Sequence, residues 1–205
     1  MEKIIILDFG SQYTQLIARR VRELNVYCEI HPYNKYEALA EDVKGIILSG
    51  SPHSVREENA PKPKIDINNL NIPLLGAQYL SHTSGGEVSQ SNTREYGRAN
   101  LNYVDNSCDL LANVSSNSQV WMSHGDTINT VPDSFKIVAS TKDVKVAGFS
   151  IEGKKSFGIQ FHPEVYHSTE GSTILKNFIV GICGCQQSWT PDAFADSTIQ
   201  QLREK

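Results

Sequence analysis

The hydrophobic and polar positions divide the chain into two halves of different character. In the first half, apolar runs at residues 3–7, 26–31, 45–48 and 73–76 predict strands, and the spacing of apolar positions at residues 13–24 predicts a helix. Fully apolar strands that alternate with amphipathic helices are typical of a parallel sheet covered on both faces. The pattern therefore predicts an α/β fold of three layers, α/β/α, around a parallel core.

The second half consists of shorter strands joined by turns, which predict an antiparallel extension of the same sheet. The expected strands are at residues 98–104, 118–122, 136–140, 146–151 and 156–161. A helical pattern at residues 174–182 follows and is expected to pack back on the core. After a polar stretch, residues 192–205 predict a polar helix with few apolar anchors. We expect one domain over residues 1–185 and a linker with a terminal helix over residues 186–205.

Composition limits the partners and the compartment. The net charge of -4 and the pI near 5.9 give no electrostatic reason to expect nucleic acid or an anionic membrane. No apolar run approaches the roughly 18 residues of a membrane span, and the start of the chain is too short for a signal peptide. Four cysteines in 205 residues are too few for a disulfide scaffold, so we expect a reduced, cytoplasmic protein.

The string GIQFHPE at residues 158–164 is the most informative one for chemistry. Residues two apart on an extended chain point to the same side, so the side chains of His162 and Glu164 can meet across Pro163. An imidazole oriented by a carboxylate is the base half of a nucleophilic triad. The alternative is a histidine at a strand end with an unrelated acidic neighbour.

The string SGSP at residues 49–52 follows the third predicted strand. Ligands of such sheets bind beyond the carboxyl ends of the strands. Gly50 leaves its amide N–H uncovered, as an oxyanion hole requires. A plain strand-to-loop turn would use the same residues, and the sequence alone leaves both interpretations open.

Several strings together connect the chain to a known family. They are ILDFGSQ at 6–12, LSGSP at 48–52, TREYG at 93–97, VWMSHGD at 120–126 and GIQFHPEV at 158–165. Over nearly its whole length the chain resembles the class I, triad-type glutamine amidotransferases, and within them the GMP synthetase type. The resemblance implies a flavodoxin-like open mixed sheet with a parallel core and an antiparallel extension.

The resemblance also implies an activity, hydrolysis of glutamine through a cysteine thioester. In that role His162 is the general acid and base, and Glu164 orients it. The implied substrate-binding residues are Gly50, Ser51, Gln78, Ser123, His124, Gly125 and Asp126. Of these, Gly50 supplies an oxyanion N–H, and the role of Asp126 is the least defined.

The implied partner is a synthetase domain that activates XMP with ATP and magnesium and accepts the ammonia. That ATP-pyrophosphatase domain begins with a phosphate loop, Ser-Gly-Gly-Val-Asp-Ser, which this chain does not contain. We expect no cofactor and no metal in the present domain. An amidotransferase that serves another acceptor, such as chorismate or carbamate, is a further alternative, and the string REYG at 94–97 weighs against it.

One departure from the family pattern affects the nucleophile itself. The family reads Leu-Gly, an aliphatic residue, Cys, Tyr, Gly, a small or apolar residue and Gln, whereas this chain reads LGAQYL at residues 75–80. About four residues between Gly76 and Ala77 are absent, among them the nucleophilic cysteine. By position, Cys28, Cys108 and the pair at 183 and 185 do not replace it.

Two explanations follow from this departure. Connections between strand and helix usually take about two to six residues, and almost none remain here, which favours a complete protein that carries the missing residues. The sequence itself, in which Ala77 directly follows Gly76, favours a real deletion. In the second case the chain is a catalytically inert module that binds or senses glutamine.

Overall fold

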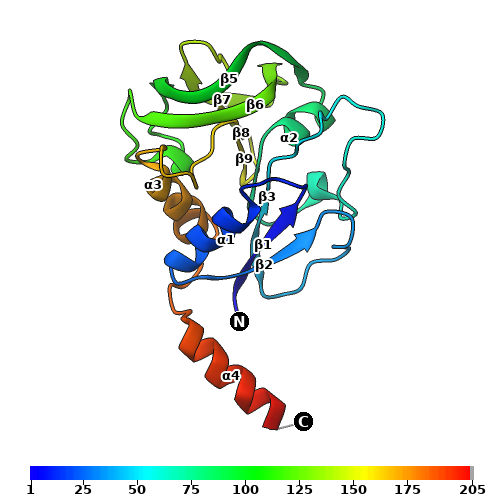
Figure 1. Ribbon diagram of the computed structural model, residues 1–205, viewed down its shortest axis with the longest axis vertical. Helices are drawn as coiled ribbons and strands as arrows, with labels where there is room; N and C mark the ends of the chain where they lie inside the picture. Colours follow the sequence, from blue (N-terminus) through cyan, green and yellow to red (C-terminus); the bar gives the residue numbers. More distant parts are fainter. Residues whose placement is uncertain (204–205) are drawn as a thin grey trace.

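A single mixed sheet organises the molecule. The computed structural model describes residues 1–203, apart from the side chains of residues 92–95, 196–198, 200 and 201. Within this part, nine strands follow the order β2-β1-β3-β4-β9-β8-β7-β5-β6 (Figure 1). The residues Thr93, Arg94 and Glu95 of the family string therefore lie outside the described side chains.

The four strands predicted for the parallel core are confirmed. They pair in parallel and are β1 (Lys3–Asp8), β2 (Tyr27–Pro32), β3 (Val43–Leu48) and β4 (Leu74–Gly76). Successive residues of β1 face opposite sides of the sheet and are all fully buried, from Ile4 to Leu7. A strand buried on both faces needs the uniformly apolar run that the sequence shows.

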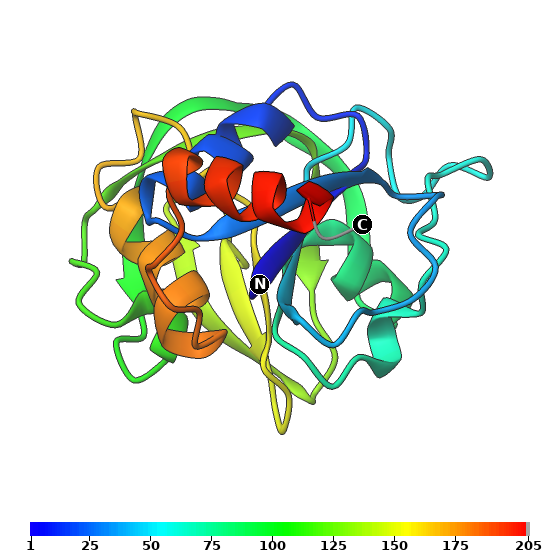
Figure 2. The same cartoon turned by 90° about the horizontal axis from the view of Figure 1, so that it is seen from below.

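Helices cover both faces of this core. On one face lie α1 (Thr14–Glu23), η2 (Asp109–Leu111), α3 (Gly171–Lys176) and its continuation η3 (Asn177–Ile182), which pack on Ile4 and Ile6. On the other lie η1 (Ile67–Asn69) and α2 (Gln78–Thr83), which pack on Ile5 and Leu7. Figure 2 shows the helices on either side of the strands when the sheet is seen from below. The expected three layers are thus present.

The antiparallel part is longer than predicted. It contains β8 (Gly148–Ile151), β7 (Phe135–Thr141), β5 (Glu87–Val104) and β6 (Gln119–Thr130). The strand predicted at residues 156–161 is β9 (Ser156–Ile159), which pairs antiparallel with β8 as predicted and also in parallel with β4, which the sequence did not indicate. Strand β9 therefore joins the two parts and brings the start of the GIQFHPE string beside β4, with Gly158 opposite Gly76.

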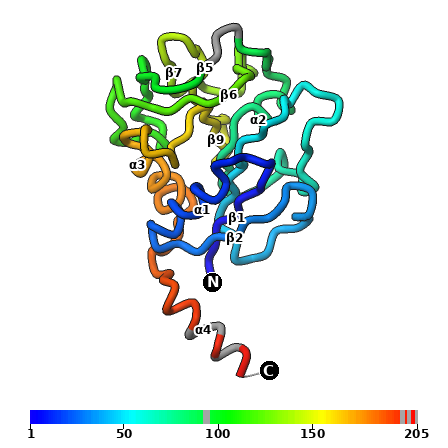
Figure 3. The backbone as a smooth tube through the Cα atoms, in the orientation of Figure 1, coloured from blue at the N-terminus to red at the C-terminus, as the bar shows by residue number. Residues whose placement is uncertain are grey.

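The last helix, α4 (Pro191–Arg203), extends away from the body where the parallel strands begin (Figure 3). Its start is fixed by aromatic contacts, since Phe194 stacks on Tyr27 with ring centroids 5.1 Å apart. Trp189 donates its main-chain N–H to the carbonyl of Asn25 at 2.8 Å. The chain thus leaves the body at the end opposite to the carboxyl ends of the parallel strands. Among the described residues, none of the helices is long and apolar enough for a membrane span.

Candidate active site

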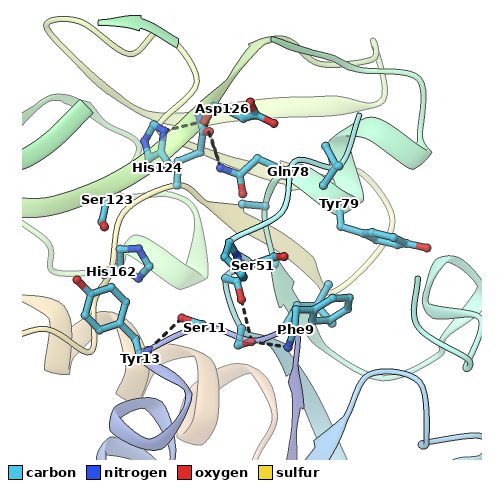
Figure 4. A pocket seen from close by; sticks show the side chains of 18 of the residues that line it. Phe9, Ser11, Tyr13, Ser51, Gln78, Tyr79, Ser123, His124, Asp126 and His162 are labelled. Carbon is cyan, nitrogen blue, oxygen red and sulfur yellow. Dashed lines mark hydrogen bonds between the residues drawn. The ribbon is translucent and has the colours of Figure 1, made fainter. Parts of the chain in front are cut away.

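The carboxyl ends of the parallel strands surround a cavity of about 720 Å³. This volume lies within the range of about 300 to 1,000 Å³ usual for small-molecule sites. Every site residue expected from the sequence lines it, and these are Gly50, Ser51, Gln78, Ser123, His124, Gly125, Asp126, His162 and Glu164. Figure 4 shows how side chains from separate segments of the chain meet there.

The predicted contact between His162 and Glu164 is confirmed. Nδ1 of His162 lies 2.8 Å from Oε1 of Glu164, and the carboxylate is only 3% exposed. A Cβ placed on Gly50 would lie 3.8 Å from Cε1 of the same imidazole. The ring therefore faces the strand ends at Gly50, as expected. A buried carboxylate on Nδ1 fixes the ring and its tautomer, which leaves Nε2 as the nitrogen that exchanges a proton.

Tyr13 packs against His162, a contact that no sequence pattern indicated. The two ring centroids are 4.6 Å apart and the rings are tilted by 52° (Figure 4). The loop before α1, which carries Tyr13, is stabilised by its own hydrogen bonds. Oδ1 of Asp8 accepts from Gly10 N at 2.9 Å and from Thr14 Oγ1 at 2.8 Å. The imidazole is thus fixed by a carboxylate at one edge and an aromatic ring on another side.

The loop at Gly50 is tied to the loop at the end of β1. Oγ of Ser49 accepts from the main-chain N–H of Phe9 at 2.9 Å and donates to the carbonyl of Gly50 at 3.0 Å. The Gly50 backbone lies beside the His162 ring, with space left for a Cβ in ordinary contact with that ring. This is an arrangement in which the Gly50 amide can face a developing oxyanion.

The segment at residues 123–126 forms the wall opposite the Gly50 loop. Nδ1 of His124 lies 2.8 Å from the carbonyl of Asp126, and this carbonyl also accepts from Nε2 of Gln78 at 3.4 Å. Gln78 donates further to Oε1 of Gln160 at 3.2 Å. Burial lowers the pKa of His124 to about 4, and this outweighs the opposing hydrogen bond to Asp126. His124 is therefore neutral near pH 7.

The Asp126 carboxylate binds the loop that carries Ser54 and Arg56. It accepts from Nη2 of Arg56 at 3.1 Å and from the Ser54 hydroxyl. Its side chain is 14% exposed and Arg56 is 40% exposed. No sequence pattern pointed to Arg56 or Ser54, because both stand in a polar loop without periodicity. The wall of the cavity thus carries one carboxylate and one guanidinium side by side.

The connection that should hold the nucleophile is a single residue long. Strand β4 ends at Gly76, helix α2 begins at Gln78, and only Ala77 stands between them. Among the residues that the structure describes, no cysteine lines the cavity, and all four cysteines are buried elsewhere. Burial raises the pKa of each thiol, to about 11 for Cys185. None of the four can supply a thiolate to His162.

Within the described residues, His, Cys, Asp and Glu side chains do not gather in any group of three that could hold a metal ion.

Comparisons with known proteins give the family. Residues 5–182 match the model of "Glutamine amidotransferase class-I". The chain belongs to the class-I glutamine amidotransferases. A protein of Cytophaga hutchinsonii named "GMP synthase [glutamine-hydrolyzing]" is 60% identical over 100% of the chain. The crystal structure of a Thermoplasma acidophilum protein described as a GMP synthase subunit matches 100% of the chain and 98% of its own, with a TM-score of 0.79 and 28% identity.

The extents of these matches add two facts about the amidotransferase. The chain spans 41% of the Cytophaga relative, so this relative is more than twice as long. A Porphyromonas gingivalis protein, also named "GMP synthase [glutamine-hydrolyzing]", is 51% identical over 209 positions and 100% of the chain, and it too is matched over 41% of its length. Since the chain has 205 residues, at least four positions of that alignment have no residue here.

Proposed function

We propose that this amidotransferase domain hydrolyses glutamine and that the complete protein uses the ammonia to convert XMP to GMP. The observation that carries the proposal is the His162–Glu164 pair, 2.8 Å apart, facing the strand ends in a cavity lined by every expected residue. The names of the Cytophaga and Porphyromonas relatives support XMP as the acceptor of the ammonia. These names do not support the alternative of an inert binding module.

The nucleophile in this proposal is a cysteine between Gly76 and Ala77 in the complete polypeptide. Three observations support it: the one-residue connection between β4 and α2, the positions of the relative that have no counterpart here, and the burial of the four other thiols. A sharp turn between strand and helix exposes a side chain at the top of such a sheet. The turn after Gly76 lies on the same cavity as His162.

The residues present can perform the remaining steps. The thiolate attacks the side-chain amide carbon of glutamine, and the amide of Gly50 stabilises the oxyanion. Protonated His162 gives its Nε2 proton to the amide nitrogen of the tetrahedral intermediate, the C–N bond breaks, ammonia departs, and a glutamyl thioester remains. His162 then takes a proton from water, the resulting hydroxide cleaves the thioester, and glutamate and the thiol are released. Glu164 holds the ring in one orientation throughout.

The main-chain end of glutamine would lie along the wall formed by residues 123–126. Gln78, Ser123, His124 and Gly125 present neutral polar groups there, and Ser51 lies at the opposite loop. We assign the α-ammonium group to Asp126, whose carboxylate is mostly buried and faces the cavity. Arg56 beside it carries the opposite charge, which suits the zwitterionic end of a free amino acid.

The remaining part of the complete protein is the proposed ammonia acceptor. In this proposal residues 1–185 are the amidotransferase domain, and residues 186–205 connect it to a synthetase domain that uses XMP, ATP and magnesium. The length of the relatives supports this arrangement, because the chain covers only 41% of them. No cofactor is proposed for the amidotransferase domain itself.

Adding the four residues tests the proposal. An aliphatic residue, Cys, Tyr and Gly are inserted between Gly76 and Ala77, and glutamate release from glutamine is measured. We expect hydrolysis with this insertion, none without it, and none when Ala replaces the inserted cysteine. A further His162→Ala change should abolish the gain. Hydrolysis that does not depend on the inserted cysteine would refute the proposal.

A further inference from the structure

The Ser168 hydroxyl joins the two segments that carry chemistry and binding. Its Oγ accepts from the main-chain N–H of Trp121 at 3.0 Å and donates to the carbonyl of His162 at 2.6 Å. The main-chain N–H of His162 in turn donates to the carbonyl of Trp121 at 2.9 Å. These three hydrogen bonds form a closed ring, which we call the Ser168 clasp. No motif of the sequence indicated it.

The clasp is well shielded from water. Ser168 is only 6% exposed, and its main-chain N–H donates to the carbonyl of Val165 at 2.9 Å. The carbonyl of His162 accepts a second bond from Val165 N, but at a longer distance of 3.3 Å. The hydroxyl therefore supplies the shorter restraint on that carbonyl. Removing it would also leave the Trp121 N–H without this acceptor, which is costly in a partly buried place.

The position of the clasp gives it a consequence for catalysis. Trp121 stands in β6 two residues before Ser123, where the proposed glutamine-binding wall begins, and His162 is the proposed acid and base. Outside the clasp, Met122 and Phe161 form an isolated β-bridge between the same two segments. The Ser168 hydroxyl thus helps to set the distance between the His162 main chain and the wall that would hold the substrate.

We propose that Ser168 is a positioning residue for His162, and this inference rests on the proposed function. Without the hydroxyl, the main chain at His162 can move relative to β6 while Glu164 still holds the ring. A displacement on the order of 1 Å at a reacting group can lower a rate by about 10²-fold. The loss should appear in kcat, because Ser168 itself does not line the cavity.

The kinetic test uses Ser168→Ala in the chain with the four added residues. We expect kcat to fall between about 10-fold and 10²-fold while KM changes by less than about threefold. Ser168→Thr keeps a hydroxyl on the same carbon and should restore kcat. Ser118→Ala is the matched control, since Ser118 is 7% exposed and its hydroxyl pairs with Thr169 Oγ1 at 3.3 Å. An unchanged kcat in Ser168→Ala would overturn the inference.

A second measurement separates this inference from the proposed function. Amide hydrogen exchange at Trp121 and His162 is followed in the chain without added residues, where no turnover is needed. Ser168→Ala should accelerate exchange at both amides, and Ser118→Ala should leave them unchanged. Unchanged exchange at the Trp121 and His162 amides in Ser168→Ala would show that the Ser168 hydroxyl does not restrain these two segments. If the chain with the added residues shows no hydrolysis but exchange accelerates as expected, the clasp stands and the proposed function fails.

Discussion

At the scale of single residues, Glu164 is the most deeply buried of the acidic side chains that line the cavity. Its carboxylate contacts Nδ1 of His162, and its main-chain carbonyl accepts from Nε of Arg20 at 2.9 Å. The side chain and the main chain of Glu164 are thus held by different elements. The residue can orient His162 without moving itself.

Replacing Glu164 with Gln should therefore impair the orientation of His162. An amide can present either an N–H or a carbonyl to Nδ1, so the ring is no longer held in one tautomer. In the chain with the added residues we expect kcat for glutamine hydrolysis to fall between about 10²-fold and 10⁴-fold. Glu170→Gln is the control, because the Glu170 carboxylate binds Ser115. Equal losses in the two variants would contradict an orienting role.

His124 makes the stability of the domain depend on pH. Its pKa in the folded chain is about 4, below the ordinary value of 6.5, so between these values the unfolded chain binds a proton that the folded chain does not. The stability due to neutral His124 is complete above pH 6.5 and is lost as the pH falls toward 4.

Urea unfolding can measure this contribution. We expect the wild-type chain to lose about 2 kcal/mol more than His124→Gln when the pH is lowered from 7 to 5, since one unit of pKa shift corresponds to 1.36 kcal/mol. Other titrating groups are common to both proteins and cancel in the comparison. If the two proteins lost equal free energies of unfolding between pH 7 and pH 5, His124 would take up its proton in the folded chain as readily as in the unfolded chain.

The one side-chain contact that the local sequence pattern predicted joins two residues that are close along the chain. His162 and Glu164 are two positions apart, so the geometry of an extended strand brings them together. Tyr13, by contrast, reaches His162 from another element, and Arg56 reaches Asp126 across 70 positions. Such contacts depend on the complete fold, and no local pattern encodes them.

At the scale of elements, the start of α3 must lie very close to the loop that carries His162. A Cβ on Gly171 would lie 1.9 Å from the carbonyl oxygen of Pro163, which no side chain can tolerate. Only glycine lets α3 approach at this point. The packing of one helix terminus thus sets the course of the chain directly after His162.

Two alanine substitutions in this region should have opposite effects on stability. Gly171→Ala forces the backbone at Pro163 to move and should lower the free energy of unfolding by about 1–3 kcal/mol or more. Gly181→Ala places its Cβ where no atom lies within 4 Å, and it should raise this free energy by about 0.5–1 kcal/mol in an exposed helical position. Chemical denaturation of both variants measures the difference. A stable Gly171→Ala would show that the two backbones are not in tight contact.

The elements of the parallel core were predictable because each strand is buried on both faces, as in β1. The first part of β5 and the last part of β6 were not. These segments pair mainly with each other, from Glu87 opposite Thr130 to Tyr96 opposite Ser123, and they contain many polar side chains. Their buried apolar residues, such as Val88 and Ile128, are too widely spaced to give a clear apolar alternation. The parallel pairing of β9 with β4 was missed because strand direction is not encoded locally.

At the scale of the whole molecule, helix α4 lies at one end of the domain and the carboxyl ends of the parallel strands at the other (Figure 1), and the cavity is at these carboxyl ends. Helix α4 leaves where the parallel strands begin, whereas Gly50, Gly76 and His162 stand where they end. In the proposed arrangement, a synthetase domain that follows α4 and receives ammonia from the cavity would turn back and dock on that face.

Docking on this face predicts that the two activities are coupled. In the full-length protein, glutamine hydrolysis should be faster by about 5-fold to 150-fold when XMP and ATP are bound, the usual range of coupling between sites. Glutaminase rates are compared with both ligands, with each alone and with neither. Equal glutaminase rates under all four conditions would count against coupling between the two activities.

The proposed activity as a whole depends on a cysteine between Gly76 and Ala77 in the active protein. Peptide sequencing by mass spectrometry of the full-length protein, after alkylation of its thiols, tests this most directly. We predict a peptide in which four residues, one of them an alkylated cysteine, separate Gly76 from Ala77. A peptide that runs from Gly76 directly into Ala77, in protein that hydrolyses glutamine, would contradict the account.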